Sequence, residues 1–426
     1  MKTFKELQDF YQGKKVLLTG HTGFKGSYLT VLLGLTGARV YGYSLPAPTD
    51  PSLFEILYGP GSSRQTRKDL KLADGGISGI GICESHIGDI RDFGELNTYV
   101  NHVRPDIIIH MAAQPIVRES YRIPRETFET NVMGTVNLLE AVRQYAAGQQ
   151  IPGQQTPGQQ TPEQQTPEQR ADTCACAAEE TGDRISFLNV TTDKVYRNKE
   201  KPGYAYREDD RLDGYDPYSN SKSCSELVTH SYRSSFFGTS AGNVRNSEAV
   251  VRVSTARAGN VIGGGDFAKD RLIPDCMRAR LAGGSVTVRN PFSTRPFQHV
   301  LEPLFVYLEI AMEQYADETK QGYYNVGPDL CDCVTAGELC DLYASCAEGF
   351  RWENRAEKNA PHEADFLRLD NTKIRETFGW KPVWHIRDAV KASADWCEAY
   401  RESPEASVRE LLRQIDTYVN RKETDV

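Results

Sequence analysis

KVLLTGHTGFKG, residues 15–26, has the pattern of a short apolar strand, a glycine turn and the start of a helix. Residues 15–19 form the predicted strand, and apolar residues at helical spacing from Phe24 to Leu35 predict a helix that Gly37 ends. The turn spaces its glycines as G-x-x-G-x-x-G, at Gly20, Gly23 and Gly26. Glycine permits a sharp turn and lets backbone N–H groups approach a pyrophosphate at the helix N-terminus. The pattern favours a dinucleotide-binding turn over a purely structural one.

Strands and helices continue to alternate after this turn. Strands are predicted at residues 39–45, 106–110, 185–190 and 249–253, and a helix at 131–142. Such alternation predicts a parallel sheet with helices on both faces. We therefore expect an α/β fold, with a doubly wound parallel-sheet Rossmann domain at residues 1–256. Shorter helices, Pro-rich turns and a last helix near 386–400 predict that 257–426 is mainly a smaller mixed α/β substrate-binding lobe, interleaved with the first domain.

Residues 148–183 interrupt the alternation with a five-residue repeat rich in Gln, Pro and Thr. Almost no apolar side chain occurs in the repeat, so burial cannot offset the entropy lost on ordering. We interpret the segment as a disordered insertion in a surface loop, with an interaction segment as the alternative.

The composition restricts the class of protein. The chain has 426 residues and a formal net charge of −8, and no basic run indicates nucleic acid or an anionic membrane. Its charged N-terminus is unlike a signal peptide, and no apolar run reaches the length of a membrane span. Ten cysteines are scattered along the chain without histidines at zinc-ligand spacing, so we expect reduced thiols and no metal. We therefore expect a cytoplasmic enzyme.

The adenosine end of the predicted dinucleotide site lacks its usual acid. Ser44 stands near the end of the second strand, where a carboxylate would hold the ribose, and it can still bond a hydroxyl. Arg64 or Arg67 could meet a 2′-phosphate, so these residues alone leave NADP open. Asp89 could accept a hydrogen bond from the adenine amine or be an ordinary loop acid.

Tyr218 and Lys222 form a Y-x-x-x-K motif. At positions i and i+4 of a helix both side chains share one face. An ammonium beside a phenol, with a nicotinamide cation nearby, lowers the phenol pKa toward neutrality, so that the phenolate can remove a proton from a sugar hydroxyl. The motif alone also suits an amphipathic surface helix, but together with the glycine turn it favours catalysis.

Thr192, Asp193 and Lys194 follow directly after the predicted strand 185–190. Polar residues past the carboxyl end of a parallel strand face the ligand crevice. A hydroxyl, a carboxyl and an amine there suit hydrogen bonding, acid catalysis and base catalysis. The alternative is a helix N-cap followed by solvated charges.

Taken together, these motifs resemble the extended short-chain dehydrogenase/reductase family and its sugar-nucleotide dehydratases. The matching segments are TGHTGFKGSYL (19–29), PAPTDPSLFE (46–55), SHIGDIRD (85–92), HMAAQPIVRESY (110–121), NVMGTVNLLEAVR (131–143), TTDKVY (191–196), GYDPYSNSKSCSEL (214–227), RAGNVIGGGDFAKDRLIPD (257–275), RPFQHVLEPL (295–304) and PHEADFLRLD (361–370). Lys194 and Gln114 resemble the branch that acts on CDP-glucose rather than on dTDP-glucose.

The resemblance implies NAD as the cofactor. The implied cofactor-binding residues are Gly20, Thr22, Gly23, Phe24, Lys25, Gly26, Ser44, Asp89, Ala112, Ala113, Tyr218 and Lys222. Gln114, Asn260, Arg271 and Arg295 are the implied substrate-binding residues; from sequence alone, a turn Asn and a surface ion pair account equally well for Asn260 and Arg271. A homodimer is implied by the family only.

The resemblance also implies a reaction sequence. Tyr218 takes the C4 hydroxyl proton, Lys222 tunes Tyr218 and holds the nicotinamide ribose, and Thr192 bonds the C4 oxygen. Asp193 is then the acid for the departing C6 hydroxyl, and Lys194 the candidate base at C5. Hydride returns to C6, which leaves a 4-keto-6-deoxy sugar. The alternatives are a 4-epimerase or a dehydratase for another nucleotide sugar, and a non-catalytic dinucleotide-binding sensor.

Overall fold

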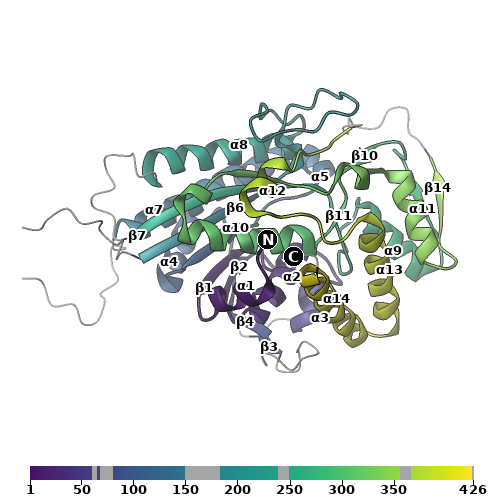
Figure 1. Cartoon of the computed structure of the whole chain (residues 1–426), viewed down its shortest axis with the longest axis horizontal. Coiled ribbons are helices and arrows are strands. Elements are labelled where there is room, and N and C mark those ends of the chain that lie inside the picture. The colour runs from purple at the N-terminus through teal and green to yellow at the C-terminus, as the bar shows by residue number, and fades with distance from the viewer. Residues whose placement is uncertain (60–64, 68–79, 149–182, 238–248, 356–365, 425–426) are drawn as a thin grey trace, which may run out of the picture.

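The computed structural model describes residues 1–59, 65–67, 80–148, 183–237, 249–355 and 366–424. Its central feature is an eight-stranded sheet with the order β12-β7-β6-β5-β1-β2-β4-β3 (Figure 1). These strands are β1 (Lys15–Thr19), β2 (Arg39–Ser44), β3 (Gln65–Arg67), β4 (Ile80–Ile87), β5 (Ile107–His110), β6 (Asp183–Thr192), β7 (Ala249–Ala258) and β12 (Tyr323–Val326). All pairs are parallel except β3 with β4. The predicted doubly wound parallel sheet is confirmed.

Helices cover both faces of the sheet because its strands are apolar on both sides. Val16 and Leu18 of β1 lie in the larger hydrophobic core, whereas Leu17 lies in a second core. The larger core includes residues of α1 (Phe4–Tyr11), α2 (Phe24–Leu35) and α10 (Leu301–Ala316). The second core includes residues of α4 (Phe93–Val103), α7 (Gly134–Ala146) and α8 (Pro217–Tyr232). This two-sided burial follows from the period-two alternation of side chains in a strand.

The strand order reverses at β1, which pairs with β2 on one side and β5 on the other. In open α/β sheets, ligands bind outside the carboxyl ends of the strands at such a reversal. Thr19, His110 and Thr192 end β1, β5 and β6 and therefore lie at this edge. The fold brings the glycine turn and the end of β6 to the same edge of the sheet.

Near the glycine turn, the predicted strand 15–19 and helix 24–35 agree with β1 and α2 in every residue. Elsewhere the bounds differ. The helix predicted at 131–142 begins as a π-helical turn, η1 (Glu129–Met133), which α7 continues. β7 runs past residue 256, and β12 from the C-terminal part pairs with it, so both predicted domains contribute to one sheet.

The C-terminal part contains α9 (Leu272–Ala282), α11 (Ala336–Cys346), α12 (Thr372–Phe378), α13 (Ile386–Glu402) and α14 (Pro404–Thr424). Its short strands pair as β8 (Val261–Ile262) with β11 (Gln298–His299), β9 (Ser285–Val288) with β14 (Arg351–Asn354), and β10 (Thr294–Arg295) with β13 (Val334–Thr335). The remaining helical pieces are α3 (Leu53–Tyr58), α5 (Val117–Arg122), α6 (Pro124–Phe128), η3 (Asp193–Val195), η4 (Arg233–Phe237), η6 (Glu318–Lys320) and η7 (Leu330–Asp332). The predicted helix 386–400 is α13; α14 was not predicted.

Several predictions fall on residues outside the described ranges. The insertion at 148–183 does so except for its two end residues, and Arg64 does so as well. Within the described ranges, no helix has the length and hydropathy needed to cross a membrane. The same ranges contain no group of three or more His, Cys, Asp or Glu side chains arranged to hold a metal ion.

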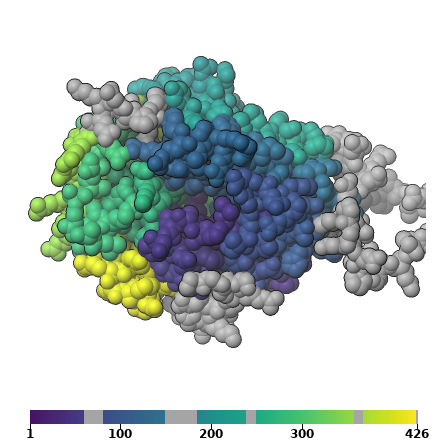
Figure 2. Space-filling model, turned by 180° about the vertical axis from the view of Figure 1, so that it is seen from behind, coloured from purple at the N-terminus to yellow at the C-terminus, as the bar shows by residue number. Residues whose placement is uncertain are grey.

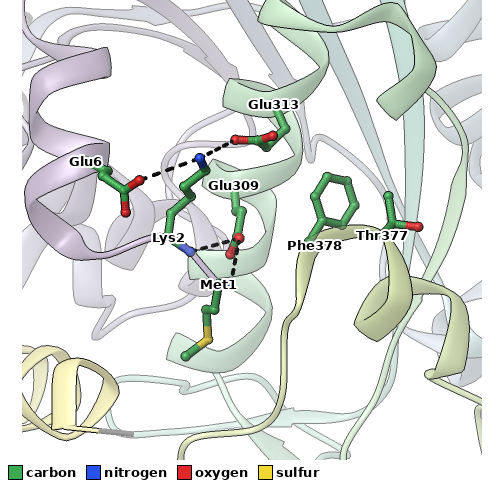
Figure 3. A pocket seen from close by; sticks show the side chains of 7 residues that line it. All are labelled: Met1, Lys2, Glu6, Glu309, Glu313, Thr377 and Phe378. Carbon is green, nitrogen blue, oxygen red and sulfur yellow. Dashed lines mark hydrogen bonds and ion pairs between the residues drawn. The ribbon is translucent and has the colours of Figure 1, made fainter. Parts of the chain in front are cut away.

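A polar pocket of about 270 Å³ lies where α1, α10 and α12 meet (Figure 3). Lys2 bridges the carboxylates of Glu6 and Glu313 at 3.5 and 3.0 Å across its mouth. The backbone N–H of Lys2 also donates to Glu309 at 2.9 Å. The pocket is lined by none of the predicted site residues, and its ion pairs fix the N-terminal segment on α10.

Candidate active site

The glycine turn has the geometry of a pyrophosphate cradle. Gly20 has a φ of +78°, and a Cβ there would lie 2.8 Å from the backbone nitrogen of Ala112. A Cβ at Gly26 would lie 2.2 Å from the carbonyl oxygen of Gly20. Gly23 is the N-cap of α2, and no side chain of the described residues caps that helix. Its first N–H groups and the positive end of its dipole therefore face the place where a phosphate would bind.

Thr19 joins the end of β1 to the segment after β5. Its Oγ1 accepts hydrogen bonds from the N–H groups of Met111 and Ala112 at 3.1 and 3.2 Å. The same hydroxyl bonds His110 Nδ1 at 2.8 Å, and His110 Nε2 bonds Thr135 Oγ1 at 3.1 Å. Burial lowers the pKa of His110 to about 3, so the imidazole is neutral. This chain of bonds fixes the loop of Ala112 and Ala113 beside the glycine turn.

At the predicted adenosine end, Thr22 and Ser44 lie together. Their hydroxyl oxygens are 2.9 Å apart, and Thr22 Oγ1 also donates to the carbonyl of Leu45. The carboxylate of Asp89 instead accepts from Arg91 Nε at 2.9 and 3.0 Å, and this hydrogen bonding lowers the pKa of Asp89. An adenine contact by Asp89 stays a prediction, and it would have to coexist with that ion pair.

Tyr218 and Lys222 lie on α8, as the Y-x-x-x-K spacing predicts. Asp216 caps the helix by accepting from the N–H of Ser219 at 3.0 Å, and Pro217 occupies its first turn. Both side chains of the motif are buried. Lys222 Nζ donates to the carbonyl of Val190 at 3.1 Å, which anchors the ammonium at the end of β6.

The predicted lowering of the Tyr218 pKa includes the charge of a bound nicotinamide, so it stays a prediction. Burial raises this pKa to about 12, against the lowering effects of a hydrogen bond with Thr192 and of the Arg271 charge. Lys222 has a pKa lowered to about 8 by burial, and its ammonium is bonded to the backbone of Val190 instead. On this chain, the charge of Arg271 is the cation that lowers the Tyr218 pKa.

Asp193 is the most unusual carboxylate at this edge. Its side chain is 0% exposed, and its Oδ1 accepts from Thr192 Oγ1 at 2.8 Å and from Lys194 Nζ at 3.0 Å. Among the described residues, Oδ2 has no hydrogen-bond partner. A buried carboxylate oxygen without a partner is costly unless a proton or a ligand hydroxyl meets it. Oδ2 is thus left open to a group that a ligand brings, and the role of Asp193 as an acid stays a prediction.

Lys194 lies between two acceptors. Its Nζ donates to Asp193 Oδ1 and, at 2.9 Å, to Asn260 Oδ1. Asn260, predicted to bind substrate, therefore lies next to Lys194. In both contacts Lys194 Nζ is the donor, and its role as the base at C5 stays a prediction.

Lys25 and Arg271 add positive charge near the same residues. Burial lowers the pKa of Lys25 to about 7, and the charges of Lys222 and Arg271 lower it further. Lys25 Nζ lies 5.8 Å from the ring centroid of Tyr307 in α10. Arg271 is the N-cap of α9 and donates to Asp266 Oδ2 at 2.9 Å. On the face shown in Figure 2, the surface is hollowed where N-terminal (purple), blue and green segments meet.

Two predicted substrate residues have other contacts. Gln114 accepts from the N–H of Ile116 at 2.6 Å and donates to Thr127 Oγ1 at 3.0 Å, so its side chain braces its own loop. Arg295 is buried in β10 and donates to the carbonyl of Thr294 at 3.0 Å. Contacts of these two residues with substrate stay predictions.

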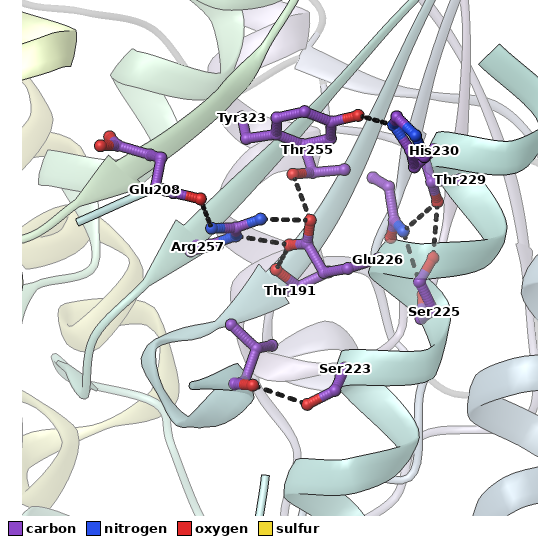
Figure 4. A network of polar contacts seen from close by, with 12 residues as sticks. Thr191, Glu208, Ser223, Ser225, Glu226, Thr229, His230, Thr255, Arg257 and Tyr323 are labelled. Atoms are coloured by element: carbon purple, nitrogen blue, oxygen red, sulfur yellow. Dashed lines mark hydrogen bonds and ion pairs between the residues drawn. The ribbon is translucent and has the colours of Figure 1, made fainter. Parts of the chain in front are cut away.

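Sequence reasoning missed a buried polar network behind the motif, centred on Glu226 and Arg257 (Figure 4). Their closest ion-pair atoms are 3.0 Å apart, and both side chains are buried. One signal was available: Glu226 stands four residues after Lys222, on the same helix face, and Arg257 interrupts an apolar strand. The contact between them depends on how α8 packs against β7, which no local sequence pattern contains.

Comparisons with known proteins show which family the chain belongs to. The model of the "NAD dependent epimerase/dehydratase family" matches residues 16–327. A CDP-glucose 4,6-dehydratase from Salmonella typhimurium is 41% identical over 92% of this chain and 93% of its own length. A dTDP-glucose 4,6-dehydratase from Xanthomonas campestris is 24% identical over 72% of this chain and 77% of its own. These matches confirm the resemblance seen in the sequence.

Solved structures show the same fold at lower identity. A UDP-glucose 4-epimerase from Stenotrophomonas maltophila, with bound NAD and formylated UDP-arabinopyranose, has a TM-score of 0.66 at 19% identity, over 91% of this chain and 99% of that one. A dTDP-glucose 4,6-dehydratase from Bacillus anthracis in complex with NAD has a TM-score of 0.62 at 16% identity, over 92% and 98%. Both support the arrangement of strands described above.

Proposed function

Because this chain belongs to the NAD dependent epimerase/dehydratase family, we propose that it is an NAD-dependent hydro-lyase that converts CDP-glucose to CDP-4-keto-6-deoxyglucose. The observation that carries the dehydratase assignment is Asp193, a buried carboxylate with an unpartnered oxygen beside Thr192 and Lys194. Loss of the C6 hydroxyl as water requires an acid at that position, whereas 4-epimerisation requires none. The relative named as a CDP-glucose 4,6-dehydratase supports the choice of nucleotide.

The residues of the glycine turn fit a bound dinucleotide. The pyrophosphate would lie against the backbone from Gly20 to Gly26, where any Cβ at either end meets backbone atoms. Ser44 and Thr22 would face the adenosine ribose, and Lys222 the nicotinamide ribose. When bound, NAD supplies reversible hydride exchange with the sugar and a positive ring beside Tyr218.

Tyr218 is the proposed base for the C4 hydroxyl. In the phenolate form it accepts that proton, and Thr192 donates a hydrogen bond to the C4 oxygen until the carbonyl has formed. Because burial raises the Tyr218 pKa to about 12, ionisation depends on nearby cations, of which Arg271 is one on this chain. A positive charge introduced with the ligands would lower this pKa further.

The 4-keto group acidifies the C5 hydrogen, so the next step is elimination of water across C5 and C6. Asp193 Oδ2 delivers a proton to the departing C6 hydroxyl. Lys194, after losing a proton, accepts the one from C5, and the electron pair of the broken C5–H bond forms the C5–C6 double bond as the C6–O bond breaks. Return of the C4 hydride to C6 and of the proton from Lys194 to C5 then gives the 4-keto-6-deoxy sugar. Asn260 holds the Lys194 amine in place through the contact at 2.9 Å. The anionic diphosphate would pair with Arg271 and Arg295, and Gln114 would face the sugar.

Product analysis tests the proposal. The purified chain is incubated with CDP-, dTDP-, UDP- and GDP-linked glucose, and the products are analysed by mass spectrometry. We expect loss of one water from CDP-glucose at the highest kcat/KM. A hexose with an intact 6-hydroxyl would indicate an epimerase, and NAD binding without turnover of any sugar nucleotide would indicate a sensor.

We further propose a cytoplasmic homodimer. Support comes from large hydrophobic side chains exposed on α8 and the adjoining helical turns, namely Leu227, Met133 and Phe236, with 55%, 50% and 48% of their surface exposed. Packing them against a second copy would remove them from water. Light scattering after size exclusion gives the mass in solution, and a monomer at micromolar concentration would overturn the dimer.

A further inference from the structure

We propose that the buried Glu226–Arg257 pair is a positioning device, which sets Tyr218 and Lys222 against Thr192. The proposal rests on the function proposed above and names residues that act through the catalytic groups without touching substrate. Figure 4 shows the network, which lies between α8 and the strands β6 and β7.

Glu226 continues the catalytic face of α8. Tyr218, Lys222 and Glu226 stand at i, i+4 and i+8, so they form one stripe along the helix. Two turns separate the carboxylate from the phenol, and one turn separates it from the ammonium. Any rotation or slide of α8 therefore moves all three side chains together.

The Glu226 carboxylate is held by two strands at once. Its Oε1 accepts from Thr191 Oγ1 at 2.5 Å and from Arg257 Nε at 3.1 Å. Its Oε2 accepts from Thr255 Oγ1 at 2.7 Å and from Arg257 Nη2 at 3.0 Å. Thr191 belongs to β6, while Thr255 and Arg257 belong to β7. The bidentate Arg257 guanidinium and the two threonine hydroxyls together fix the orientation of the Glu226 carboxylate.

Arg257 is fixed in turn from the far side. Its Nη1 donates to Tyr196 Oη at 2.8 Å and to the carbonyl of Glu208 at 2.9 Å. Tyr196 Oη donates to Asn325 Oδ1 of β12 at 2.6 Å. The network thus extends from the catalytic helix through three adjacent strands.

Stability alone is a poor explanation for this pair. Removing two charges from water costs about as much as their attraction returns, and hydrophobic side chains of similar volume often serve the fold as well. What the pair adds is a fixed orientation of α8 relative to β6 and β7. Thr191 precedes Thr192, so the bond from Thr191 to Glu226 fixes the stripe of α8 relative to the hydroxyl that bonds Tyr218. A misplacement of about 1 Å at such a site can cost on the order of a hundredfold in rate.

The pair also acts on the charge of Lys222. Glu226 raises the pKa of Lys222, which burial lowers to about 8. Loss of the Glu226 charge would lower that pKa further and leave Arg257 as an uncompensated cation nearby. Lys222 would then lose its proton at a lower pH.

Two matched threonine variants test the positioning role. Thr191→Val and Thr255→Val each remove one hydroxyl that donates to Glu226, but only Thr191 adjoins a catalytic residue. We expect Thr191→Val to lower kcat with CDP-glucose by roughly tenfold, at unchanged KM, and Thr255→Val to lower it by less than about threefold. Equal losses in both variants would reduce the network to a structural role and overturn the proposal.

A pH profile gives the second readout. In Glu226→Gln the alkaline limb of kcat should move to lower pH, because Lys222 loses the charge that raises its pKa. An unmoved limb in the folded single variant overturns the proposal. If Glu226→Gln does not fold, the comparison of Thr191→Val with Thr255→Val still tests the positioning role. Inactivity of the wild-type chain toward every sugar nucleotide would instead reject the proposed function itself.

Discussion

At the scale of single residues, Asp193 is a buried carboxylate that is unfavourable for the stability of the fold. Its Oδ2 has no partner among the described residues although the side chain is 0% exposed. Asp193→Asn keeps the shape but cannot release a proton to the C6 hydroxyl. We expect kcat to fall by about 10²–10⁴, while the free energy of unfolding changes by less than about 1 kcal/mol in either direction. Urea unfolding and product formation measure the two; a severely destabilised variant would mean that the carboxylate serves folding.

Tyr218 carries the other proton step, and its replacement separates chemistry from binding. Tyr218→Phe removes only the hydroxyl, so we expect turnover of CDP-glucose to fall by about 10²–10⁴ while NAD affinity remains within a few-fold. Calorimetric titration with NAD and a product assay on the same preparation check both. Unchanged turnover would reject Tyr218 as the base, and lost NAD binding would show that the phenol serves the cofactor pocket instead.

At the scale of elements, hydrogen bonds through His110 connect β1, β5 and α7. Its ordinary pKa of 6.5 falls to about 3 in the fold because of burial. As the pH falls, the imidazole is therefore protonated in the unfolded chain before it is protonated in the folded chain. Its contribution to stability is full above pH 6.5 and is lost as the pH falls toward 3. The variant His110→Gln has no imidazole at this position, so its stability does not change with pH for this reason. The stability advantage of the wild type should shrink by about 1.4 kcal/mol per pH unit between roughly pH 6 and 4.

Urea titrations at pH 7, 6, 5 and 4 measure this difference for His110→Gln. The matched control is His102→Gln in α4, whose imidazole has 60% of its side chain exposed. A pH-independent difference for His110→Gln, or the same trend in the control, would contradict the assignment of a neutral buried imidazole.

The elements near the glycine turn were predictable because local rules act there without competition. β1 and α2 follow from an apolar run, helical spacing and glycines that backbone contacts require. The π-helical turn at 129–133 and the length of β7 depend on partners far along the chain, which no local pattern contains. The same holds for the site. Spacing indicated Tyr218 and Lys222, whereas the Glu226–Arg257 contact depends on the packing of α8 against β7.

At the scale of the whole molecule, one hydrophobic core extends from α1 to α14 and includes residues of both predicted domains. Leu411 of α14 is 0% exposed within it. Leu411→Ala should therefore cost about 2–5 kcal/mol and should destabilise the sheet together with the C-terminal part. Tyrosine and tryptophan fluorescence, which reports on both parts, and loss of NAD binding should give one coincident urea transition at a lower midpoint. Arg409→Ala, at an exposed position of α14, should stay within about 0.5 kcal/mol of the wild type. Two separated transitions, with NAD binding retained after the first, would show that the lobes unfold independently despite their shared core.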